Sequence, residues 1–140
     1  MQQKNKIGFS VISAFLLLSF IIFLSSFSLQ QNKKWDAPES AKKLKNPVAA
    51  DDASLAAGKA LYMKQCKSCH GNSGRGDGPK AANLDVSCKD FTKEDFKSQT
   101  DGEMYWKSTE GRDPMPSFKT KLSDDDRWHI VNYIKTFTKK

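Results

Sequence analysis

The sequence has few of the residues that build disulfide-rich or β-rich folds. Only three cysteines occur in 140 residues. This number is odd and too small for a disulfide scaffold. No internal repeat and no convincing strand pattern is present. Charged residues make up 28% and hydrophobic residues 38% of the chain, as in globular domains, which excludes wholesale disorder and a multi-span membrane protein. The length suits about one domain.

The charge balance is basic, with 23 Lys and Arg against 16 Asp and Glu and a formal net charge of +7. A basic surface favours acidic partners. Charge alone does not indicate nucleic-acid binding, and no nucleic-acid motif accompanies it, so we predict none.

No charged residue occurs between residues 7 and 32, and Lys4 and Lys6 precede this apolar run. The run exceeds the roughly 7–15 apolar residues of a usual signal peptide and reaches the ~20 residues that cross a bilayer. Ser26-Phe27-Ser28 is a tolerable cleavage site. Residues 1–29 are therefore predicted as either a cleaved signal peptide or a retained transmembrane anchor. Both alternatives place the remainder outside the cytoplasm, in the periplasm, free or tethered to the cytoplasmic membrane.

A polar, lysine-rich stretch with Pro38 and Pro47 follows this segment. It shows no apolar periodicity. We predict that residues 30–50 are an extended linker and that residues 51–140 form the folded domain.

Helix signals are clear in the domain. Asp51 and Asp52 predict the start of a helix that runs to about Cys66, since acidic residues suit a first helical turn. The glycine-rich stretch 71–79 is a loop. Thr92 starts a short helix, and Asp101 caps another that ends near residue 111.

The last helix is predicted to begin at Ser123, with Asp126 completing an acidic variant of the capping box. The helical spacing of Ile130, Ile134 and Phe137 gives it an apolar face. The domain is thus predicted to be all-α, with three to four short helices. So small a core is marginal alone, and a bound cofactor would help to close it.

The chemistry is carried by Cys66-Lys67-Ser68-Cys69-His70. This C-x-x-C-H spacing is the c-type haem attachment motif. Two thiols three residues apart on one turn can reach both vinyl groups of a porphyrin, and the adjoining His70 points at the iron. The sequence therefore predicts one covalent haem c on Cys66 and Cys69, with His70 as an axial ligand.

Three other interpretations share part of this pattern. A thioredoxin-like pair needs a βαβ setting, and no strand precedes Cys66. A zinc site would need a fourth ligand, for which Cys88 is available. A plain disulfide between Cys66 and Cys69 is the third alternative.

The second axial ligand has four candidates in the sequence: Met63, Met104, Met115 and His129. Met63 is too close to the attachment turn, Met104 suits core packing, and His129 lies at the edge of a helix face. Met115 stands between two prolines in a non-helical loop, because each proline restricts the residue before it. We predict Met115.

These motifs together resemble a small bacterial class I monohaem cytochrome c over about residues 52–138. The matching motifs are Gly58-x-x-x-Tyr62, Cys66-x-x-Cys69-His70-Gly71, Gly74-x-Gly76-x-Gly78-Pro79, Met115-Pro116 and Trp128 with Tyr133-Ile134.

The resemblance implies a cytochrome c fold in which Gly58 and Tyr62 meet the last helix. It also implies that the Pro79 carbonyl accepts a hydrogen bond from His70, which would orient the imidazole. Arg75, Arg112 and Trp106 are candidates for the haem propionates. Cys88 has no counterpart in the family pattern and is expected to be a half-buried thiol without a role.

The expected function is one-electron transfer and not catalysis, because two protein ligands leave the iron no open position. His/Met ligation raises the reduction potential. Lys64, Lys67, Lys80 and Lys89 are expected to ring the haem edge and attract an acidic redox partner. The partner is predicted to be an oxidase, reductase or dehydrogenase of a respiratory chain. The alternatives are a haem subunit of a larger dehydrogenase, or a gas-binding or peroxidatic protein if Met115 does not bind.

Overall fold

The computed structural model describes residues 34–138. The predicted export segment lies outside these residues, and so its fate stays a prediction. Contacts group residues 36–140 into one compact unit. Within the described range no helix is both long and apolar enough to cross a membrane.

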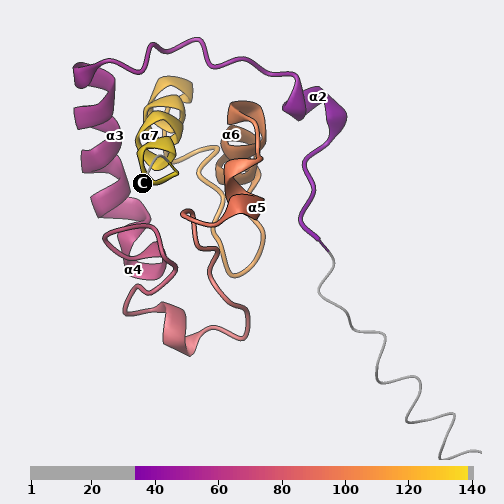
Figure 1. Cartoon of the computed structure of the whole chain (residues 1–140), viewed down its shortest axis with the longest axis vertical. Helices are drawn as coiled ribbons and strands as arrows, with labels where there is room; N and C mark the ends of the chain where they lie inside the picture. Colours follow the sequence, from indigo (N-terminus) through magenta and orange to yellow (C-terminus); the bar gives the residue numbers. More distant parts are fainter. Residues whose placement is uncertain (1–33, 139–140) are drawn as a thin grey trace, which may run out of the picture. The chain divides into compact units, whose positions relative to one another are not determined.

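Residues 34–138 form six α-helices and a 3-10 turn, with no β-strand among them (Figure 1). In chain order these are α2 (Glu39–Lys42), α3 (Asp52–Gln65), α4 (Lys67–His70), η1 (Ala81–Asn83), α5 (Glu94–Lys97), α6 (Asp101–Glu110) and α7 (Asp124–Phe137). The all-α prediction is confirmed. The described part of the predicted domain, residues 51–138, holds five helices where three to four were expected, because the four residues of α4 are too few to show a hydrophobic period.

The helix caps agree with the sequence in two of three cases. Asp51 accepts a bond from the Ser54 N–H at 2.8 Å at the start of α3, and Ser123 with Asp126 forms the predicted capping box of α7. The prediction of Asp101 as a cap is wrong. Thr100 caps α6, because only Thr100 has a glutamate three positions later to return the bond.

The two longest helices, α3 and α7, lie side by side (Figure 1) and cross at Gly58. A Cβ atom at Gly58 would lie 2.0 Å from the His129 carbonyl oxygen and 2.9 Å from the Tyr133 Cβ. One turn later the rings of Tyr62 and Tyr133 pack at 5.4 Å. The expected crossing is confirmed, and it depends on a residue without a side chain.

We expect Gly58→Ala to destabilise the protein. The added methyl group would overlap a backbone oxygen that cannot rotate away, and overpacking of this kind costs about 1–3 kcal/mol. Urea unfolding of the haem-loaded protein measures the loss. Ala56→Val, at an exposed position of α3, is the control and should cost only a few tenths of a kcal/mol through helix propensity. Equal stability of both variants would show that the helices do not cross here.

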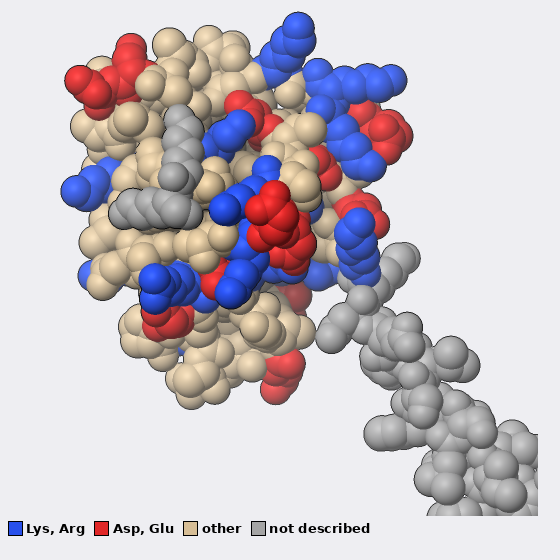
Figure 2. All heavy atoms as spheres, in the orientation of Figure 1, with Lys and Arg blue, Asp and Glu red and all other residues tan. Residues whose placement is uncertain are grey.

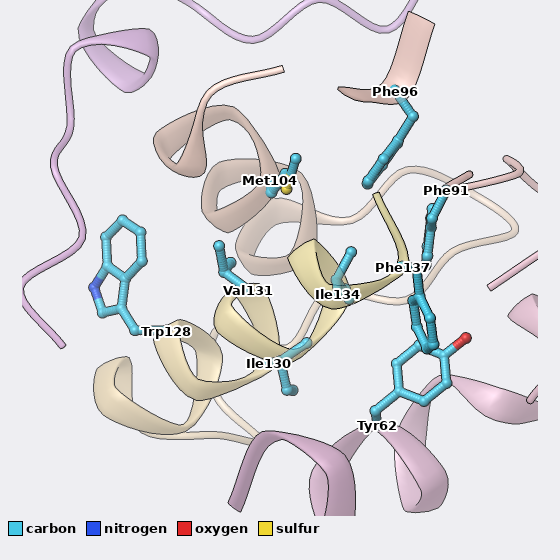
Figure 3. Packing of buried hydrophobic residues seen from close by; sticks show 9 residues of the cluster. All are labelled: Tyr62, Phe91, Phe96, Met104, Trp128, Ile130, Val131, Ile134 and Phe137. Carbon is cyan, nitrogen blue, oxygen red and sulfur yellow. The ribbon is translucent and has the colours of Figure 1, made fainter. Parts of the chain in front are cut away.

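The core lies between α3, α6 and α7 (Figure 3). Its buried residues are Tyr62, Phe91, Phe96, Met104, Trp128, Ile130, Val131, Ile134 and Phe137. Aromatic rings make up one side of this cluster, with Phe91 stacked on Phe96 at 4.4 Å and Tyr62 edge-on to Phe137 at 5.4 Å. This side faces the attachment turn, because Phe91 also stacks on His70.

Part of the predicted linker packs against the domain. Ala37 and Ala41 are buried, and a Cβ at Gly102 of α6 would lie 2.0 Å from the Ala41 carbonyl oxygen. The Asn46 amide donates to the Asn132 side chain on α7 at 2.7 Å. The stretch after Asp36 is therefore not an extended tether, since small residues and side-chain amides attach it without an apolar period. The boundaries at residues 29 and 50 stay predictions.

Candidate functional site

The two predicted attachment cysteines lie on one backbone turn at the end of α3. The Cys66 N–H donates to the Tyr62 carbonyl at 2.8 Å, and the Cys66 carbonyl accepts from the His70 N–H at 2.9 Å. Cys66 thus ends α3 and begins α4, while Cys69 and His70 follow within that turn. The structure brings the three residues together as their spacing predicts.

The glycine-rich loop closes around this turn. Its N–H groups cap the last carbonyls of α4: Gly76 donates to His70 at 3.0 Å, and Gly78 to Cys69 at 3.1 Å. These bonds satisfy acceptors that a helix end leaves open. A Cβ at Gly78 would lie 2.5 Å from the Ser68 carbonyl oxygen. The loop therefore needs glycine here to approach the turn.

Tyr62 ties α3 to the same loop. Its ring is fully buried, and its hydroxyl donates to the Gly71 carbonyl at 2.8 Å. Burial raises the pKa of Tyr62, so the phenol stays protonated and remains a donor.

The His70 imidazole is largely enclosed and stacks on Phe91 with 4.6 Å between ring centroids. Burial lowers the pKa of His70, and a hydrogen bond with the Lys89 backbone partly opposes this effect. The buried Nδ1 has no hydrogen-bond partner. The expected bond to the Pro79 carbonyl is therefore not formed in this structure, where the ring lies against residues 89–91 instead.

Both cysteines of the attachment turn are half-buried. Burial, reinforced by the neighbouring Cys69, raises the pKa of Cys66 to about 12. Cys88, expected to be half-buried and without a role, is half-buried, and its backbone lies against the glycine-rich loop, where a Cβ at Gly76 would lie 2.4 Å from the Cys88 carbonyl oxygen. Sequence reasoning missed this contact between Gly76 and Cys88, because nothing in a separation of 12 residues signals proximity.

Met115 lies in the loop between α6 and α7, drawn in orange in Figure 1. Its backbone pairs with that of Arg112 through two bonds of 2.8 and 2.9 Å. The side chain is half-buried. Gly111, with φ of +69°, starts the loop, and a Cβ there would lie 2.8 Å from the Met115 carbonyl oxygen. A glycine is thus needed where the loop turns back on itself.

The far end of this loop is held by Arg127, which the sequence analysis did not single out. Only 3% of Arg127 is exposed. Its guanidinium donates to the carbonyls of Lys119 and Leu122 at 3.0 and 2.9 Å, and to the Tyr105 hydroxyl at 3.0 Å. Arginine is mostly a surface residue, so only the fold reveals this role.

The other candidate axial ligands are engaged elsewhere. Met104 is buried in the core, and Met63 is exposed on α3. The His129 Nδ1 lies 2.8 Å from the Ser54 hydroxyl, between α3 and α7. Among the methionines of residues 34–138, Met115 is therefore the one that lies in a loop, and its backbone is held there by hydrogen bonds with Arg112.

The proposed zinc alternative finds no support in the described part of the chain. Residues 34–138 contain no group of three or more His, Cys, Asp or Glu side chains that could hold a metal ion. Cys66, Cys69 and Cys88 are all free thiols.

The charged residues assigned from the sequence lie mostly on the surface. Arg75 and Arg112 are exposed, as are Lys64 and Lys80. Lys67 is half-buried, and Lys89 is paired with Asp95. Figure 2 shows basic and acidic side chains interspersed over the face in view.

Family comparison identifies the fold. The family described as Cytochrome c matches residues 55–138. The chain belongs to the cytochrome c family. This cytochrome c domain includes the attachment turn and the Met115 loop, and the family transfers electrons through haem. No curated protein matches the chain.

The chain is also similar to a solved structure. It is a chain of the reducing HAO-like protein complex Kustc0457/Kustc0458 of Kuenenia stuttgartiensis, with 31% sequence identity and a TM-score of 0.61. The match covers 81% of the present cytochrome c chain and 56% of the other. The chain thus spans little more than half the length of that relative.

Proposed function

We propose that this protein is an exported one-electron carrier with a single haem c, covalently held by Cys66 and Cys69 and axially ligated by His70 and Met115. The observation that carries the proposal is the attachment turn: two free thiols and an enclosed imidazole within five residues, fixed by loop hydrogen bonds. Haem c, when bound, supplies a one-electron iron couple.

The residues present fit such a group. The buried Nδ1 of His70 has no partner, and an unsatisfied buried polar atom is costly in a finished structure. The imidazole thus has bonding capacity that the surrounding protein does not use. The two thiols lie on the turn that ends in His70, as covalent attachment requires.

The chain's own groups keep this site rigid. Loop N–H groups hold the carbonyls of Cys69 and His70, and Tyr62 holds Gly71. On the other side, the Ser117 hydroxyl donates to the Thr109 carbonyl at 2.6 Å, and Arg127 secures the end of the loop. Fixed positions for both ligands suit electron transfer, because little has to move when the charge changes.

We expect mass spectrometry of the exported protein to show one haem added per chain. The haem should resist acid-acetone extraction, because two thioether bonds would hold it. A mass equal to the bare polypeptide, or a bound zinc ion in place of haem, would contradict the proposal.

Deletion of residues 2–28 should give haem-free protein, because the apolar segment would direct the domain to the compartment where haem is attached. The haem content of the truncated and full chains, expressed side by side, measures this effect. Equal haem content would overturn the export proposal. N-terminal sequencing of the mature protein distinguishes a cleaved signal peptide from a retained anchor. A mature end near Leu29 indicates cleavage, and an intact N-terminus indicates an anchor.

A second candidate is a haem subunit of a larger redox enzyme. The observation that favours it is the likeness to a chain of a HAO-like protein complex. Under this alternative catalysis would lie on another chain. Purification from native membranes under mild conditions distinguishes the two: a carrier elutes alone, and a subunit elutes with a stoichiometric partner.

A further inference from the structure

The loop that carries Met115 ends in a tight turn at residues 118–122. Two N–H groups at the end of this turn donate to the Phe118 carbonyl, at 3.2 and 3.1 Å. Phe118 itself is buried, and its N–H donates to the Ser108 carbonyl of α6 at 3.2 Å. The turn is therefore attached to α6 only three residues after Met115.

Arg127 of α7 reaches into this turn, with only 3% of the residue exposed. Its Nη1 atom lies 3.3, 3.0 and 2.9 Å from the carbonyl oxygens of Phe118, Lys119 and Leu122. Its Nη2 atom donates to the Tyr105 hydroxyl of α6 at 3.0 Å and is paired with Asp124. A buried charge is costly without such partners. One guanidinium thus joins the turn, α6 and α7.

Tyr105 is itself held in place by packing. Its ring stacks on Trp128, the residue after Arg127, with 3.9 Å between the ring centroids. The guanidinium carbon of Arg127 lies 5.2 Å from the Tyr105 ring centroid. The hydroxyl that accepts from Arg127 therefore belongs to a ring that is packed from two sides.

We propose that Arg127 is a positioning residue for Met115, which keeps the Met115 sulfur on the iron and slows its replacement by an external ligand. This inference rests on the proposed ligation by His70 and Met115. Backbone pairing with Arg112 ties Met115 to its loop, so a loop that moves aside carries Met115 with it. Such a movement would take carbonyl acceptors away from a buried charge, which makes the opening of the loop costly.

Cyanide binding to the ferric, haem-loaded full chain measures this opening, because cyanide replaces Met115 only when the sulfur leaves the iron. Arg127→Lys keeps the charge, but one ammonium cannot reach the Tyr105 hydroxyl and all three carbonyls at once. We expect the second-order rate constant for cyanide to rise about tenfold or more, as for the loss of a hydrogen bond to a charged group. Tyr105→Phe keeps the ring and removes only the hydroxyl, so it should raise the rate about threefold.

Two controls separate positioning from general stability. Lys121→Ala changes an exposed side chain of the same turn and keeps its backbone, so it should bind cyanide at the wild-type rate. Gly58→Ala should destabilise the protein at the crossing of α3 and α7 and leave the cyanide rate unchanged. If Gly58→Ala and Arg127→Lys raise the rate equally for equal losses in unfolding free energy, Arg127 is merely structural and the inference is wrong.

The remaining outcomes distinguish this inference from the proposed function. A wild-type ferric protein that lacks the weak absorption band of Met–iron bonding would overturn the ligation by Met115. With that band present, a wild-type cyanide rate in Arg127→Lys would overturn the positioning role and leave the ligation intact. If Arg127→Lys does not fold, Tyr105→Phe decides, and a wild-type rate in that variant likewise rejects the role of Arg127.

Discussion

Replacing both attachment cysteines, Cys66→Ala with Cys69→Ala, is expected to abolish covalent haem completely. Each thiol supplies one thioether bond, and no other described thiol lies on the turn that ends in His70. The measurement is the mass of the denatured, exported chain, in which only covalently bound haem survives.

Cys88→Ser is the matched control, because it removes a thiol from the same neighbourhood without touching the motif. Its haem should be present and covalent. Loss of haem in this variant would show that Cys88 is itself an attachment residue and that the assignment to Cys66 and Cys69 is wrong. Covalent haem in the double alanine variant would lead to the same conclusion.

Met115→Ala is expected to have the second-largest effect, on the reduction potential and on ligand access. Loss of a thioether ligand should lower the potential and open the iron to carbon monoxide or cyanide, since axial ligand identity governs both properties. The ferric protein should also lose the weak absorption band at the red end of the visible spectrum that accompanies Met–iron bonding. Redox titration and optical spectra of the purified variant give all three results.

Met104→Ala separates ligation from packing. Met104 is buried in the core, so its truncation should cost about 2–5 kcal/mol of unfolding free energy and leave the spectrum unchanged. If Met104→Ala removes the band and Met115→Ala keeps it, the ligand assignment is reversed.

Carbon monoxide binding by the unmodified protein is a further test of the Met115 assignment. Rapid binding of carbon monoxide by the unmodified ferrous protein would mean that Met115 leaves the iron open. The carrier function would then give way to the gas-binding or peroxidatic alternative.

The attachment motif was predictable because its chemistry depends on residues close in sequence. Cys66, Cys69 and His70 lie within one turn, and local backbone geometry suffices to bring them together. The same holds for the capping box of Ser123 and Asp126, which spans one helical turn. The Gly58 crossing was also expected, although only through the family resemblance.

Features that join distant residues were decided by the tertiary structure. The residues after Asp36 pack against the domain through two contacts, one between Ala41 and Gly102 and one between Asn46 and Asn132. No periodicity in the sequence predicts either contact. The bond expected between His70 and Pro79 is replaced by packing against residues 89–91. Arg127 has no distinguishing pattern in the sequence, and only the fold shows that it is buried among loop carbonyls.

The three cysteines show the same difference between local features and contacts of distant residues. Residue type and spacing predict that Cys66 and Cys69 hold a porphyrin, because thiol reach along one turn is a local property. That the Cys88 backbone packs against Gly76 depends on the glycine-rich loop folding back over the turn. A sequence specifies such a contact only through the packing of the whole domain, and therefore only the tertiary structure could decide it.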